Sequence, residues 1–77
     1  MQDDADLLEE FGRRLRHQRT AIGLSQEELA HRCGMHRTYV SSVERGERNI
    51  ALLNIVSLAT ALGTDASTFV AGLSRGP

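Results

Sequence analysis

Residues 25–48, SQEELAHRCGMHRTYVSSVERGER, decide the fold of this 77-residue chain. Ser25 precedes an apolar helical pattern, and Glu28 follows three residues later, which is the spacing of a capping box. Leu24 and Leu29 add a hydrophobic staple across the same turn. The glycine in the middle of the stretch ends a helix at little conformational cost. The stretch therefore predicts a helix, a glycine turn and a second helix.

The second helix of this stretch is predicted from about Arg37 to Arg45. At 100° per residue its polar side chains share an arc of about 140°, and its apolar side chains occupy the other side. Serine and threonine are mediocre helix formers and do little for a solvated surface. In a major groove they permit close approach to base edges, and arginine can bind guanine with two hydrogen bonds. The pattern favours a DNA-reading face over a plain surface, and this face comprises Arg37, Thr38, Ser41, Ser42 and Arg45.

Two charged residues interrupt inward-facing helix sides. Arg19 follows Leu15 by four residues in a helix predicted over residues 5–22, and Glu44 follows Val40 by four. An unpaired charge at either position would be expensive to bury. We therefore expect a buried or half-buried ion pair between Arg19 and Glu44. It would join the first helix of the chain, predicted over residues 5–22, to the third, predicted over about residues 37–45.

Gln26 occupies the first turn after Ser25. The free amides and the positive end of the helix dipole can hold a phosphate there. A solvated surface glutamine fits the local sequence equally well, so the residues alone leave both interpretations open.

Two more helices are predicted after a polar link at residues 47–49. The fourth runs from about Ile50 to Leu62, and its polar stripe is so narrow that burial on more than one side is expected. A last short helix, capped by Thr64 or Asp65, carries an apolar patch that either the core or a second subunit can cover. The predicted fold class is all-α, with five helices in one domain over residues 1–77, an acidic head at 1–6 and a fraying tail at 74–77.

Composition bounds the class of protein. Hydrophobic residues make up 40% and charged residues 25%, as in soluble globular chains. No apolar run approaches the ~18 residues that span a bilayer, and the acidic start differs from the basic head of a signal peptide. The single cysteine cannot form an internal disulfide, in agreement with a reducing compartment. We expect a cytoplasmic protein with no membrane partner, no cofactor and no evident small-molecule ligand.

The net charge of −1 argues against nucleic-acid binding if it is read as a bulk property. The distribution of charge changes that interpretation. Five of the ten acidic residues lie within residues 3–10, whereas four arginines cluster around the central stretch. A locally positive face therefore remains possible, formed around Arg32, Arg37, Arg45 and Arg48.

Metal binding and catalysis have no visible site in the sequence. His31, Cys33 and His36 are neighbours, but Cys33 is on the inward side of its helix and no second cysteine or carboxylate completes a zinc site. The chain also lacks a phosphate loop, a nucleophile elbow and a pair of inward carboxylates. We expect no metal and no enzymatic activity.

The chain resembles the lambda-repressor-like helix-turn-helix regulators, also called the XRE or Cro/repressor type. The resemblance covers nearly the whole chain, from FGRRLRHQRTAIGLSQEELA through HRTYVSSVERGERN to LLNIVSLATALG. HRTYVSSVERGERN also resembles the small controller proteins of restriction-modification systems. Two positions depart from the family pattern, because His36 and Ala51 stand where better helix caps are usual.

The resemblance implies roles for particular residues. Gln26 would touch phosphate, and the major groove would receive Arg37, Thr38, Ser41 and Ser42. Tyr39, Arg45 and Arg48 would lie toward the DNA backbone or an adjacent groove. Relatives of this size usually bind double-stranded DNA as homodimers through their last helices. Here this would place part of the fourth helix at the interface together with Phe69, Val70 and Leu73.

Two functions from different classes follow. The first is a homodimeric transcriptional regulator on a pseudo-palindromic operator, including the case of a restriction-modification controller. The alternative is an antitoxin or protein-interaction module of the same fold, in which the apolar last helix binds a partner and DNA binding is secondary.

Overall fold

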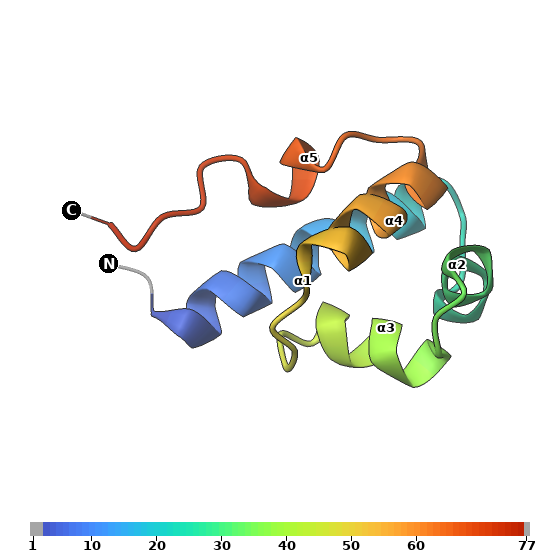
Figure 1. Cartoon of the computed structure of the whole chain (residues 1–77), viewed down its shortest axis with the longest axis horizontal. Helices are drawn as coiled ribbons and strands as arrows, with labels where there is room; N and C mark the ends of the chain where they lie inside the picture. The colour runs from blue at the N-terminus through green and yellow to red at the C-terminus, as the bar shows by residue number, and fades with distance from the viewer. Residues whose placement is uncertain (1–2, 77) are drawn as a thin grey trace.

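The computed structural model describes residues 3–76, and five helices account for the regular structure of this part of the chain. They are α1 (Asp4–Ala21), α2 (Gln26–Cys33), α3 (Arg37–Glu44), α4 (Leu52–Leu62) and α5 (Ser67–Val70). Figure 1 shows α3 on one side of α1 and α5 on the opposite side. The all-α, five-helix prediction is confirmed. Met1, Gln2 and Pro77, from the predicted head and tail, lie outside the described residues.

The capping signals read from the sequence set the start of α2. The Ser25 hydroxyl accepts a hydrogen bond from the Glu28 amide at 3.0 Å, and the Ser25 amide donates to Glu28 Oε1 at 2.9 Å. This donation from the Ser25 backbone is the main reason that the pKa of Glu28 is lowered. Gly34 ends α2 at φ +66°, a left-handed conformation that glycine adopts without strain. The predicted capping box and glycine turn are therefore both confirmed.

The core draws side chains from all five helices. The largest fully buried residues include one or two from each helix: Leu15, Leu29, Val40, Val43, Leu58 and Phe69. The Phe69 ring lies 5.5 Å from the Phe11 ring between centroids, which joins α5 to α1. Because so short a helix as α5 contributes one of the largest core side chains, this part of the chain belongs to the folded unit.

The end of α3 is held unusually close to α1 by a glycine. A Cβ atom at Gly12 would lie 2.4 Å from the Glu44 carbonyl oxygen and 2.5 Å from that of Val43. Both neighbours are backbone atoms, which cannot move aside as a flexible side chain can. The absence of a side chain at Gly12 therefore allows the end of α3 to pack directly against the backbone of α1.

The C-terminal part of the chain differs from the sequence expectations in detail. The fourth helix begins at Leu52 rather than near Ile50, and its N-cap residue, Ala51, makes no side-chain capping bond. The N-cap of α5 is Ala66, which makes no side-chain capping bond, rather than the expected Thr64 or Asp65. Asp65, the residue before it, accepts a hydrogen bond from the Ser67 amide at 2.8 Å. Arg14 of α1 donates to the Ala71 carbonyl at 2.7 Å and thereby ties down the segment after α5. Fraying of residues 74–77 stays a prediction.

Among residues 3–76, no helix is both long enough and apolar enough to cross a membrane.

Candidate nucleic-acid interface

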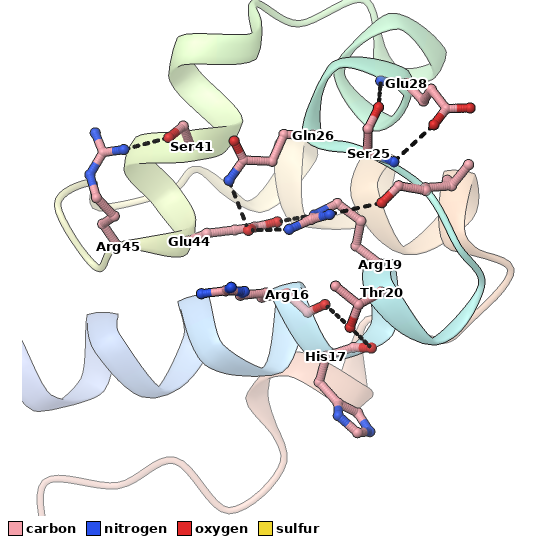
Figure 2. A network of polar contacts seen from close by, with 11 residues as sticks. Arg16, His17, Arg19, Thr20, Ser25, Gln26, Glu28, Ser41, Glu44 and Arg45 are labelled. Atoms are coloured by element: carbon pink, nitrogen blue, oxygen red, sulfur yellow. Dashed lines mark hydrogen bonds and ion pairs between the residues drawn. The ribbon is translucent and has the colours of Figure 1, made fainter.

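A buried ion pair locks the end of α3 onto α1 and the start of α2. Arg19 Nε and Nη2 donate to the two carboxylate oxygens of Glu44 at 2.6 and 2.9 Å. The side chains are only 10% and 3% exposed, respectively. Arg19 Nη1 also donates to the Leu24 carbonyl at 2.8 Å, and Glu44 accepts from Gln26 Nε2 at 3.1 Å (Figure 2). The ion pair expected between Arg19 and Glu44 is thus present in the structure.

The bond to Glu44 determines how Gln26 is presented. Gln26 is half-buried at the first position of α2, with its amide nitrogen directed toward Glu44 (Figure 2). An amide nitrogen has two hydrogens, so one remains after the bond to Glu44 is made. Gln26 is consequently a positioned donor rather than a freely rotating surface side chain.

The exposed side of α3 is headed by Arg37 and Thr38. Both residues are exposed, and within residues 3–76 the Arg37 side chain makes no ion pair or side-chain hydrogen bond. His36 precedes them as N-cap without a side-chain capping bond. The first turn of α3 therefore offers a guanidinium and a hydroxyl whose side chains make no hydrogen bond or ion pair with any other of residues 3–76.

Ser42 does not belong to this exposed face, and the expectation that it would meet the major groove is wrong. Ser42 is only 7% exposed. Its hydroxyl donates to the Tyr39 carbonyl at 2.9 Å and accepts from Arg48 Nε at 3.3 Å. Its carbonyl also accepts from the Glu47 amide at 2.9 Å. The chain that follows α3 folds back over Ser42, which a helical projection of α3 alone does not include.

Arg45 is engaged by a neighbouring carboxylate. Arg45 Nε and Nη2 donate to the two carboxylate oxygens of Glu47 at 3.0 and 3.1 Å, and Nη1 contacts the Ser41 hydroxyl. Both members of the ion pair are more than half exposed. The hydrogen bond from Arg45 lowers the pKa of Glu47, which stays ionised at neutral pH. Glu47 thus occupies the arginine fork with the same two-oxygen geometry that a phosphate would use.

Tyr39 and Arg48 form a second polar cluster beside the first. The Tyr39 hydroxyl accepts from Asn54 Nδ2 of α4 at 3.1 Å, and the Arg48 guanidinium lies over the Tyr39 ring at 5.8 Å from its centroid. Tyr39 is half-buried and Arg48 is exposed. Two of the three residues expected near the DNA backbone or an adjacent groove are therefore in contact with each other, and Tyr39 anchors them to α4.

An open cleft of about 630 Å³ brings several of the predicted residues together. It lies between α1, the start of α2 and the exposed side of α3. Sequence reasoning did not single out Arg16 of α1, because a helical projection shows Arg16 only as a solvated position. The lining comprises Arg16, Arg19, Ser25, Gln26, Glu27, Arg37, Ser41 and Arg45.

The expected dimer surface needs correction at one residue. Phe69 is 0% exposed and fills the core, so it cannot contact a second subunit. Val70 is exposed and Leu73 is half-buried. Among residues 3–76, the large apolar side chains with the highest exposed fractions lie instead at the start of α4, where Leu52 is 70% and Leu53 is 78% exposed.

Comparisons with known proteins agree with this architecture. A family model described as helix-turn-helix, HTH_3, matches residues 15–69. The chain is 52% identical over 64 residues to a hypothetical transcription factor of Neisseria meningitidis. The matched region covers 83% of this chain but only 60% of that protein. The chain therefore spans less than two thirds of that relative's length.

Solved structures of other regulators are similar in both sequence and fold, and two of them illustrate this. The restriction-modification controller protein C.AhdI from Aeromonas hydrophila superposes with a TM-score of 0.79 at 55% identity, over 84% of this chain and 97% of that one. The biofilm regulator SinR, solved in complex with DNA, superposes with a TM-score of 0.75 at 28% identity, over 78% of this chain and 97% of that one. With its capping box, glycine turn and matched family model, this chain belongs to the helix-turn-helix family of XRE-type regulators.

Proposed function

We propose that this protein is a sequence-specific DNA-binding transcriptional regulator that inserts α3 into the major groove. The observation that carries the proposal is that the first turn of α3 exposes polar side chains that are free to bind DNA. Arg37 and Thr38 are exposed there, and the Arg37 side chain has no internal partner within residues 3–76. A free guanidinium fork matches the O6 and N7 acceptors of guanine, and the threonine methyl suits the methyl group of thymine. We assign Arg37 and Thr38 to base edges.

The flanking residues serve the DNA backbone in this proposal. Gln26, held by Glu44, donates its remaining amide hydrogen to a phosphate. Arg45 can exchange the Glu47 carboxylate for a phosphate, since both present paired oxygens to the fork. Arg48, held over Tyr39, extends the positive surface beyond the end of α3. Such contacts fix the register of the protein on the duplex but do not read sequence.

We further propose a homodimer that forms through the start of α4. Leu52, Leu53 and Val56 are 70%, 78% and 46% exposed, and they lie at helix spacings that place them on one side of α4. Contact between two such faces would remove this apolar surface from water. Two-fold symmetry would then present two copies of α3 to successive major grooves about 34 Å apart. The similarity to C.AhdI supports the narrower proposal of a restriction-modification controller protein.

Selection from a random duplex pool with purified protein tests the proposal. We expect an enriched motif of two inverted half-sites separated by about one helical turn, centre to centre. Leu53→Glu provides a matched control, because the exposed Leu53 can be replaced without disturbing the core. This variant should lose the paired half-sites. If a folded wild-type protein enriches no motif, the proposal is wrong and a protein partner becomes the alternative.

A further inference from the structure

We infer that Arg16 of α1, which lies outside α2, α3 and the turn between them, is a contact residue for the duplex backbone. In this inference Arg16 forms one wall of a phosphate-binding cleft whose other walls are the first turn of α2 and the exposed side of α3. The ligand is a phosphodiester of double-stranded DNA. The inference rests on the proposed function and adds a residue and a helix to it.

The geometry of the cleft supports this assignment. Arg16 lines it from α1, while Gln26 lines it from α2 and Arg37 and Ser41 line it from α3. Figure 2 shows the Arg16 side chain directed from α1 toward the side of the molecule where Glu44 and Arg45 lie. The donors that face the cleft thus come from three helices. The Arg19–Glu44 ion pair and the backbone contacts of Gly12 hold these helices in fixed positions.

The charges of the cleft are unequally balanced. Glu44 neutralises Arg19 and Glu47 is paired with Arg45. Within residues 3–76, Arg16 and Arg37 have no carboxylate within ion-pair distance, and Glu27 is the one acidic residue that lines the cleft. Two unpaired guanidinium groups therefore face one exposed carboxylate. In a protein with a net charge of −1, this is a local excess of positive charge.

The position of the cleft relative to α3 favours a backbone phosphate over a base. The major groove is about 12 Å wide and is bordered by phosphates, so a helix inserted in it has a phosphate chain beside it. The cleft lies beside the exposed side of α3, at the level where α1 and α2 meet it. Arg16 would reach these phosphates from α1, whereas Arg37, at the head of α3, is assigned to the base edges within the groove.

The salt dependence of DNA binding tests the inference. We compare wild type, Arg16→Gln, Arg16→Lys and Arg13→Gln on a selected duplex and a random duplex between 50 and 200 mM salt. Arg13→Gln is the matched control, because it removes the same charge from the same helix at an exposed residue that contacts Glu10 and does not line the cleft. Each phosphate contact contributes about 0.9 to the slope of log affinity against log salt.

We expect Arg16→Gln to lower affinity for both duplexes by the same factor and to reduce the slope by about 0.9. The wild-type advantage should therefore shrink by about 3.5-fold across the fourfold rise in salt, while Arg16→Lys keeps the wild-type slope. Thermal unfolding should be unchanged, since Arg16 is exposed. If wild type binds and Arg16→Gln behaves like Arg13→Gln, the inference is wrong while the proposed function stands. If wild type binds neither duplex, both are wrong.

Discussion

Replacing Arg19 with alanine is the most informative perturbation of the fold, because this side chain joins α1 to α3 and to the turn before α2. The variant leaves the Glu44 carboxylate, whose side chain is 3% exposed, with the Gln26 amide as its remaining side-chain partner. It also removes the donor to the Leu24 carbonyl. Breaking a buried pair by removing one partner costs about 3–5 kcal/mol. A 77-residue chain is expected to have roughly 4–12 kcal/mol of total stability at 0.05–0.15 kcal/mol per residue.

Urea unfolding followed by circular dichroism measures this loss. With a slope of ~1 kcal/mol per molar urea, the midpoint should fall by about 3–5 M, and the variant can be unfolded even without urea. Arg45→Ala is the control, since it breaks a pair that is more than half exposed and should cost at most about 1 kcal/mol. The double variant Arg19→Met, Glu44→Leu should recover much of the loss, because no charge stays buried. A midpoint for Arg19→Ala equal to that of wild type would refute this reasoning.

Three further predictions concern other contacts. Hydrogen bonds from Arg13 and Arg14 lower the pKa of Glu10 from 4.5 to about 2. Above pH ~4.5 the wild-type protein should therefore be more stable than Glu10→Gln, and thermal scans should show this difference disappearing as the pH falls toward 2. Glu47→Gln should raise affinity for specific and random DNA alike in fluorescence anisotropy, because it frees Arg45 and removes a negative charge; an unchanged affinity would contradict the proposed exchange. Gly12→Ala should destabilise the protein by about 1–3 kcal/mol in urea, despite the better helix propensity of alanine, and an increase in stability would count against the close approach of α1 and α3.

Local signals allowed the sequence to predict most of the helices. The Ser25 and Glu28 side chains cap α2 through contacts within four residues, so no tertiary information was needed. The pairing of Arg19 with Glu44 was also predictable, because two charges on inward-facing sides each require a partner. In these cases the physical constraint is visible along the chain itself.

The exposure of the site residues was less predictable where it depends on how the chain folds after the helix that carries them. Ser42 lies on the polar arc of α3, but Arg48 and the Glu47 amide cover it. The apolar pattern around Phe69 fits a core or an interface equally well, and its contact with Phe11 places it in the core. Arg16 could not be identified because its significance depends on the distance between two helices. Helical periodicity gives the direction of a side chain but not what lies opposite.

The specificity ratio, the affinity for the selected duplex divided by that for a random one, tests the central claim that the first turn of α3 reads bases. Arg37→Ala should lower this ratio by about 5-fold to 150-fold, equivalent to 1–3 kcal/mol for one bidentate contact. Gln26→Ala should weaken both affinities and leave the ratio unchanged. If Arg37→Ala instead weakens both duplexes by the same factor, Arg37 contacts only the backbone and the proposed reading of bases by this turn is contradicted.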